Sequence, residues 1–169
     1  MKSMNPIRFK AWIDENRHLL RPPVGNKMVW PDGEFIVMVV GGPNRRKDFH
    51  INGTPEFFYQ LEGDMTLRVR TSSGTEDVPI REGEIFLLPS GVPHSPQRNA
   101  GTVGLVIEQL RPEGMKDGLA WFCEACGEKL YEEYFVLKSV ETDFPPVFER
   151  FFSDPAKCTC RACGTVMEK

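Results

Sequence analysis

The chain has 169 residues, a length expected for one main hydrophobic core with a small additional segment. Hydrophobic residues make up 40% of it and charged residues 27%, which excludes a wholly disordered chain. Its 21 Lys and Arg against 24 Asp and Glu give a net charge of −3, so nucleic acid is a poor candidate partner. No apolar run approaches the 18 residues of a membrane span, so we expect a cytoplasmic protein without a membrane partner.

The N-terminal region predicts one short helix. Asn5-Pro6 places a capping residue before a proline at the first helical position, and Phe9, Trp12 and Ile13 form one apolar stripe. The helix is expected to end near Arg17. His18 has no supporting pattern and is expected to lie exposed at the helix end.

Six short β-rich runs follow, separated by Gly, Pro, Asn and Asp. They cover residues 34–40, 57–61, 65–70, 76–80, 84–88 and 102–110. In the run 65–70 apolar and polar residues alternate strictly, which predicts a strand with one buried and one wet face. The expected fold class is all-β, a sandwich or barrel.

The segment after Arg111 has a different character and contains all five cysteines. A stretch of mixed polarity over 128–141 precedes a predicted helix that begins at Asp143 and Pro145-Pro146. The packing stripe of this helix comprises Val147, Phe148, Phe151 and Phe152. The expected organisation is a barrel with its N-terminal helix over 1–111 and a C-terminal extension over 112–169.

Four of the cysteines form two matching motifs, Cys123-Glu-Ala-Cys126-Gly and Cys160-Arg-Ala-Cys163-Gly. Each glycine permits the tight turn that lets backbone amides approach the sulfurs. Four thiolates close a coordination sphere, so this predicts a structural site for iron or zinc rather than a catalytic one. Cys158 is left over, either as a free thiol or as a local rival of Cys160.

His50, Glu56 and His94 are the candidate catalytic metal ligands. Two imidazoles and one carboxylate on one face of a metal leave up to three positions open, the arrangement used by non-heme Fe(II) for oxygen activation. By residue type alone, two loop histidines and a strand-end carboxylate would be the commoner explanation. The spacing favours the metal site, because six residues separate Glu56 from Gly63 and the stretch 83–94 has the form Gly-x5-Pro-x-Gly-x2-His.

These two motifs resemble those of the cupin superfamily, small β-barrels with a metal site inside the barrel. The match covers about residues 34–111. The sequence departs from the usual cupin motifs at two places. His50-Ile51-Asn52 stands where many cupins have His-x-His, and Arg98 stands where the second motif usually ends in Asn.

Over nearly its whole length the chain is similar to the bacterial 3-hydroxyanthranilate 3,4-dioxygenase family. The similar stretches are 41–44, 50–61, 85–89, 94–98, 105–108 and the paired CxxC motifs. The resemblance implies a homodimer that binds Fe(II) through His50, Glu56 and His94. It also implies ring cleavage of 3-hydroxyanthranilate by O2 to 2-amino-3-carboxymuconate semialdehyde, a precursor of quinolinate. Whether this serves NAD biosynthesis or tryptophan breakdown is left open by the sequence. The four-cysteine site is rubredoxin-like in this family.

The resemblance further implies that Arg46 and Arg98 bind the substrate carboxylate and that Arg46 also contacts O2. It makes Glu108 the residue that accepts or orients the proton of the substrate hydroxyl, and it places Asn26 and Asp48 near the site. Strand parity agrees with the two arginines, since Arg46 lies four residues from His50 and Arg98 four from His94. Arg45 would then point the other way.

Two alternatives remain. A non-catalytic cupin that senses metal or binds a small carboxylate would use the same barrel, because this fold serves many functions. A nucleic-acid-binding zinc ribbon would use the paired cysteines, but that segment lacks a basic stripe.

Overall fold

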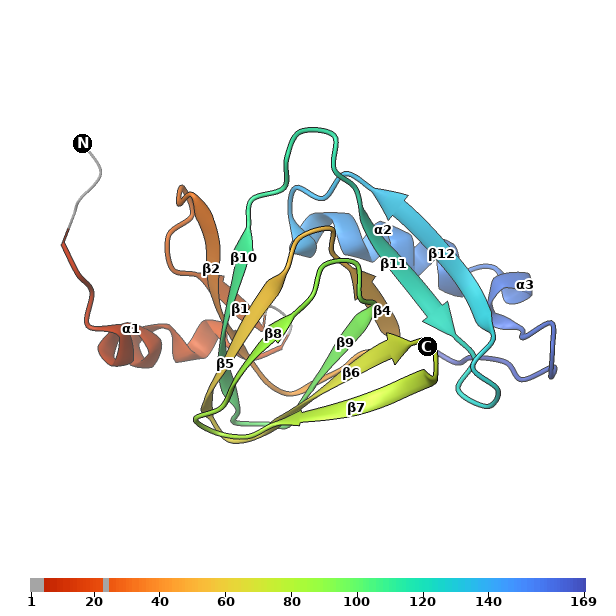
Figure 1. Ribbon diagram of the computed structural model, residues 1–169, viewed down its shortest axis with the longest axis horizontal. Helices are drawn as coiled ribbons and strands as arrows, with labels where there is room; N and C mark the ends of the chain where they lie inside the picture. Colours follow the sequence, from red (N-terminus) through yellow and green to blue (C-terminus); the bar gives the residue numbers. More distant parts are fainter. Residues whose placement is uncertain (1–4, 23–24) are drawn as a thin grey trace.

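The structure is a computed structural model that describes residues 5–22 and 25–169. Twelve strands and a few short helices follow one another along the described chain (Figure 1). In chain order the elements are α1 (Phe9–Asn16), the 3-10 helix η1 (Arg17–Leu19), β1 (Asn26–Met28), β2 (Phe35–Gly41), β3 (Asn44–Arg45), β4 (Asp48–Ile51), β5 (Glu56–Glu62), β6 (Met65–Thr71), β7 (Gly74–Ile80), β8 (Ile85–Leu88), β9 (His94–Arg98), β10 (Val103–Gln109), β11 (Asp117–Phe122), β12 (Lys129–Phe135), α2 (Val140–Phe152) and α3 (Pro155–Cys158).

The strands form two antiparallel sheets that face each other. One sheet has the order β1-β2-β10-β5-β8, and the other has the order β12-β11-β4-β9-β6-β7, with β3 paired to β9. This arrangement confirms the all-β barrel class. All six predicted runs are strands, and the additional strands β4 and β9 carry most of the candidate site.

Apolar side chains fill one end of the space between the sheets. Met65, Leu67 and Val69 on β6 point inward and pack with Phe58 of β5 and Val106 of β10, as the alternation predicts. This packing holds the two sheets at a fixed separation. The other end of the interior contains the buried polar side chains beside an apolar wall and forms the pocket described below.

The N-terminal helix covers part of the outer face of the five-stranded sheet (Figure 1), where Ile13 packs against Val39. The predicted start at Asn5-Pro6 is wrong, because α1 begins at Phe9 with Arg8 as its N-cap. Residues 5–8, Ile7 among them, are exposed, so no burial against the sheet stabilises a helical turn there. The helix ends where predicted, and His18 is exposed in the 3-10 turn that follows.

The C-terminal segment both extends the barrel and covers it. β11 hydrogen-bonds to β4, so residues beyond 111 belong to the seven-stranded sheet. The two-part division at residue 111 stays a prediction. α2 lies against β11 and β12 (Figure 1), and its residues Val147 and Phe151 are buried against Trp121.

The predicted start of α2 is also wrong, since the helix begins at Val140, three residues before Asp143. The Asp143 carboxylate accepts hydrogen bonds from the backbone N–H groups of Lys138 and Ser139 at 2.7 and 2.9 Å. It therefore stabilises the helix start from within the first turn.

Among the helices of the described residues, none has the length and apolar character needed to span a bilayer.

Candidate active site

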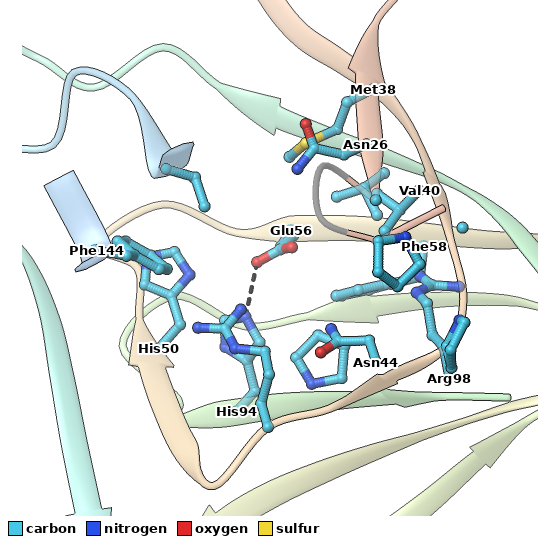
Figure 2. A pocket seen from close by; sticks show the side chains of 18 of the residues that line it. Asn26, Met38, Val40, Asn44, His50, Glu56, Phe58, His94, Arg98 and Phe144 are labelled. Atoms are coloured by element: carbon cyan, nitrogen blue, oxygen red, sulfur yellow. Dashed lines mark ion pairs between the residues drawn. The ribbon is translucent and has the colours of Figure 1, made fainter. Parts of the chain in front are cut away.

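Strand register brings the predicted ligands together. His50 on β4 is paired directly with His94 on β9 in one sheet, and Glu56 on β5 is paired with Glu108 on β10 in the facing sheet. Potential ligand atoms of His50, Glu56 and His94 lie within 4.8 Å of one another. Figure 2 shows the Glu56 carboxylate pointing toward the two imidazoles. Three segments distant in sequence thus form one cluster.

The cluster is buried and has an unsatisfied acceptor. Glu56 is 5% exposed, and its Oε2 lies 3.0 Å from His94 Nε2 without the geometry of a hydrogen bond. Among the described residues this oxygen has no hydrogen-bond partner. Apart from the ion pair with His94, its lone pairs stay available to a cation. A cation between the two imidazoles and Glu56 would satisfy it, and these donors suit a divalent metal.

Each imidazole is oriented by an acceptor on its other side. His94 Nδ1 lies 3.0 Å from the Val92 carbonyl oxygen, and His50 Nε2 lies 2.7 Å from Asp117 Oδ2. A proton on each of these nitrogens leaves the second nitrogen of the ring with a lone pair. This is the usual support for metal-binding histidines.

The electrostatics of the cluster also favour a cation. Burial lowers the pKa of His50, despite the hydrogen bond with Asp117, so the ring is neutral and can act as a ligand. Burial also opposes the charge on His94, but the Glu56 carboxylate more than offsets this and raises the pKa of His94. Burial likewise disfavours the charged form of Glu56. The attraction of His94 is stronger, so the pKa of Glu56 is lowered. The site thus attracts positive charge, which a metal ion would supply in place of the His94 proton.

Arg98 is a buried cation with few acceptors. It is 2% exposed, its Nη1 donates to Gln60 Oε1 at 3.0 Å, and its Nε has no hydrogen-bond partner among the described residues. Burial lowers the pKa of Arg98 to about 10. In Figure 2 this guanidinium lies across the pocket from His50, with Glu56 between them. It is suited to bind an anionic group of a ligand in the pocket.

Gly104 on β10 makes room for Arg98. A Cβ at this position would lie 2.7 Å from Arg98 Nη1 and 2.9 Å from Gln60 Oε1. The missing side chain therefore lets the Arg98 guanidinium and the Gln60 amide lie close to β10.

Arg46 also lines the pocket, but a carboxylate already accompanies it. Its Nε donates to Asp48 Oδ1 at 3.1 Å, and its guanidinium lies 5.3 Å from the centre of the Phe144 ring. Burial acts to lower the pKa of Arg46, but Asp48 raises it above the ordinary value. Asp48 thus contacts Arg46 and does not itself line the pocket, whereas Asn26 does. Arg45 is exposed and is not among the residues that line the pocket.

Glu108 is held at its position by two donors. Asn52 Nδ2 donates to Glu108 Oε2 at 3.0 Å, and Arg111 Nη1 contacts the same oxygen. Burial, aided by the nearby Glu56 carboxylate, raises the pKa of Glu108 to about 7, although Arg111 opposes the shift. A carboxylate with this pKa can exchange a proton at neutral pH.

The pocket has a volume of about 590 Å³, within the range of small-molecule sites. Met38, Val40 and Val106 form an apolar wall, and the α2 residue Phe144 closes one side, with its ring centre 5.3 Å from that of His50. Figure 2 shows Phe144 beside His50. The pocket can therefore hold a flat aromatic ligand between an apolar wall and the metal ligands.

Four residues of the site are not predicted by the sequence: Asn52, Arg111, Asp117 and Phe144. Asp117 opens the apolar strand β11 and is 0% exposed. The only hint of its role in the sequence is a charged residue at the start of an apolar run. The same pattern is typical of an ordinary strand end at the surface.

The four paired cysteines form the second cluster, whose sulfurs lie within 4.8 Å of one another. Cys123 Sγ is 3.6 Å from Cys163 Sγ, and Cys126 Sγ is 3.5 Å from Cys160 Sγ. Contacts with Thr165 and with the neighbouring cysteines lower the pKa of Cys163 to about 6, which favours the thiolate form that binds metals.

The two cysteine motifs have the same turn geometry. In each, the glycine after the second cysteine has φ of 77°, and its N–H donates to the carbonyl of the first cysteine, at 2.8 Å for Gly127 and 2.9 Å for Gly164. This confirms the predicted turns. Cys158 is buried outside the cluster, with Sγ 3.3 Å from the Phe151 carbonyl oxygen. It is therefore not a rival of Cys160.

Comparisons with known proteins agree on one family. The family model described as 3-hydroxyanthranilic acid dioxygenase matches residues 1–152. A 3-hydroxyanthranilate 3,4-dioxygenase of Xanthomonas euvesicatoria pv. vesicatoria is 58% identical over 159 residues, covering 94% of this chain and 90% of the relative. A protein of the same name from Jannaschia sp. is 53% identical, covering 98% and 93%.

Among solved structures, a cupin-2 domain containing protein from Shewanella frigidimarina is similar with a TM-score of 0.49 and 18% identity, covering 62% of this chain and 94% of that one.

Proposed function

Since the chain belongs to the 3-hydroxyanthranilic acid dioxygenase family, we propose that ferrous ion held by His50, Glu56 and His94 supports its ring-cleaving activity. The substrate is 3-hydroxyanthranilate, and both atoms of O2 enter the product, 2-amino-3-carboxymuconate semialdehyde. One observation supports this most strongly. A buried metal-ligand cluster, a buried arginine short of acceptors and a carboxyl group with a pKa near 7 line the same pocket.

The residues have separate tasks. Arg98 binds the substrate carboxylate through its planar fork, and Arg46, already paired with Asp48, assists at the same group and contacts O2. This fixes the aromatic ring against the apolar wall. Ferrous ion held by His50, Glu56 and His94 would bring the substrate and O2 together and activate the O2.

Glu108 accepts the proton of the substrate hydroxyl. Its pKa of about 7 suits this task, because the carboxylate is available at neutral pH and is still basic enough to take a proton. Asn52 and Arg111 hold the carboxylate while the proton is transferred. Phe144 and the apolar wall limit the access of water to the reacting groups.

The test is an anaerobic assay. Metal-free protein is loaded with Fe(II), mixed with 3-hydroxyanthranilate, and then exposed to measured O2. We expect one O2 consumed per substrate, with formation of the ring-opened aldehyde seen in the absorption spectrum. Anthranilate, which lacks the hydroxyl group, serves as the control and should consume no O2. Tight binding of 3-hydroxyanthranilate without turnover would instead support a non-catalytic binding protein.

The four-cysteine cluster has a different proposed role, the binding of a structural iron or zinc ion. Four sulfurs leave no position open for a substrate. Elemental analysis of the purified protein distinguishes the two metals. We also propose that the protein acts in the cytoplasm, where reducing conditions keep paired cysteines available as metal ligands.

We also propose a homodimer formed through the outer face of the five-stranded sheet. Ile85 and Leu87 on β8 are 65% and 63% exposed, and Phe57, Tyr59 and Ile107 on the neighbouring strands continue the same apolar surface. A surface of this kind suits a two-fold contact with a second copy. Light scattering should show a dimer for the native chain and a monomer for Leu87→Glu. A native chain that stays monomeric at high concentration would refute the proposal.

A further inference from the structure

Behind the pocket, one guanidinium joins two buried carboxylates. Arg111 Nε donates to Asp117 Oδ1 at 3.2 Å and its Nη2 donates to Asp117 Oδ2 at 2.8 Å, while Nη1 contacts Glu108 Oε2. The Arg111 side chain is 10% exposed, that of Glu108 is 5% and that of Asp117 is 0% exposed. The three groups are thus held in a largely water-free space, where directional contacts are strong.

Both carboxylates also contact the reaction site. Asp117 Oδ2 lies 2.7 Å from His50 Nε2, so the oxygen that accepts from Arg111 also orients a metal ligand. Glu108 lines the pocket itself. A continuous path of contacts therefore connects His50 to Glu108 through Asp117 and Arg111, although the two strands that carry them belong to different sheets.

We propose that Arg111 and Asp117 are positioning residues that fix His50 and Glu108 in one common arrangement. Asp117 holds the His50 ring at the angle that presents its free nitrogen to the metal. Arg111 holds Asp117 with two parallel donors and holds Glu108 with the third. The Asp117 carboxylate is shared between Arg111 and His50, so a change at Arg111 can reach the metal ligand through this one group.

The proposal makes a specific claim about coupling. Among the described residues Arg111 has no hydrogen bond or ion pair with a metal ligand, so its contacts reach His50 through Asp117, while its charge also acts on Glu56 from a distance. Removing either residue should weaken the metal site, but removing both should do little more than removing one. This non-additivity separates a relay from two independent stabilising contacts.

The experiment titrates Co²⁺ into metal-free Asp117→Asn, Arg111→Met and the double variant. Co²⁺ bound to the cysteine cluster is distinguished by its sulfur charge-transfer absorption, so the two sites are followed separately. Each single variant is expected to weaken Co²⁺ binding at the His-Glu-His site 10- to 100-fold, the range found when such supporting residues are lost. The double variant should lie within about threefold of the weaker single variant.

Single variants that bind Co²⁺ within twofold of the native chain would overturn the proposal, as would effects that multiply in the double variant. Arg68→Met and Asp77→Asn provide the matched control, because Arg68 and Asp77 form an exposed pair at 2.9 Å on the outer face. Neither should change Co²⁺ binding. If Arg111→Met fails to fold, Arg111→Lys replaces it, since Lys keeps the charge but cannot make the two parallel contacts.

The role of Arg111 in holding Glu108 rests on the proposed function, whereas its role in holding Asp117 does not. With saturating Fe(II), Arg111→Lys should lower kcat about tenfold with little change in the KM for 3-hydroxyanthranilate, because Arg98 is untouched. A raised KM with unchanged kcat would contradict a role in holding Glu108. If the native chain had no turnover at all, the proposed function would fail while the Co²⁺ titrations still tested the relay.

Discussion

The two metal-ligand clusters are built in opposite ways. The pocket cluster draws His50, Glu56 and His94 from strands of two facing sheets, whereas the cysteine cluster is made of two nearly identical turns. The pocket donors are nitrogen and oxygen atoms, three in number and buried, which leave coordination positions free. The cysteine cluster has four sulfurs, of which those of Cys126 and Cys163 belong to exposed residues. The difference shows that an open site needs a rigid barrel around it, while a closed site can create its own local structure.

The two clusters are nevertheless parts of one structure. The C-terminal segment that carries the cysteines also supplies Asp117 behind His50 and Phe144 beside it. Phe144 belongs to α2, whose buried face packs with Cys158 and Met167 next to the cysteine turns. The following changes test how separate the two clusters are.

The largest effect is expected from His94→Ala. Loss of one of three ligands should empty the pocket of metal and reduce ring cleavage at least about a thousandfold, since the metal assembles the reactants. The cysteine cluster should keep one metal ion per chain, which elemental analysis would show. Loss of both metals from a folded variant would contradict the separation of the two clusters.

Glu108→Gln should act on chemistry without affecting the metal. We expect kcat to fall by about 10²–10⁴, the usual contribution of a positioned base, with unchanged iron content. In the native enzyme a protonated Glu108 cannot accept a proton, so kcat/KM should rise as the pH passes upward through about 7. In Glu108→Gln this rise of kcat/KM with pH should be absent. Iron loss in Glu108→Gln would show that the residue supports the metal instead.

Arg98→Ala should raise the KM for 3-hydroxyanthranilate about 10- to 100-fold, as expected for the loss of hydrogen bonds between charged groups. Arg98→Lys should have a smaller effect, because Lys keeps the charge without the planar fork. Steady-state kinetics on both variants is the measurement. Equal KM values for the two would argue against a direct contact with the carboxylate.

Cys126→Ser should change stability far more than chemistry. The cluster should lose its metal, and the loss of roughly 3 kcal/mol would lower the midpoint of thermal unfolding by about 6–12 °C in a chain of this size. The folded fraction should still cleave the ring when the pocket contains iron. A well-folded, iron-loaded variant without activity would mean that the two clusters depend on each other.

Gly104→Ala should have the smallest effect. The added methyl group has to displace Arg98 and Gln60, and about 1 kcal/mol of overpacking corresponds to about a fivefold rise in KM. The metal content of both clusters should stay the same. An unchanged KM would show that Arg98 can bind the substrate from a shifted position.

The sequence predicts those parts of the fold whose burial follows a simple period. β6 alternates between an apolar and a polar face, while β5 and β10 have enough apolar residues to be recognised despite their inward Glu56 and Glu108; all three are predicted. β4 and β9 are missed as strands because their inward residues are polar: Asp48, His50, His94 and Arg98. The hydrophobic pattern that identifies a strand disappears where the strand lines a reaction site.

Sequence patterns also predict some residues of the site and miss others. His50, Glu56 and His94 have a spacing that a motif can capture, and the structure brings them together. Asp117 and Arg111 acquire their surroundings only when β11 pairs with β4, a contact between segments more than 60 residues apart. Single-sequence patterns do not record such a contact, so both residues look like ordinary surface charges.

The register of β10 constrains how the chain can change. Inside this strand Val106 and Glu108 face the pocket, while Leu105 and Ile107 face outward. Insertion or deletion of one residue within the strand would exchange these two sets and bring an aliphatic side chain to the place of the base. Descendants of this sequence are therefore free to vary in length in connections such as 31–34, but a change of register within β10 would remove the activity and expose the core together.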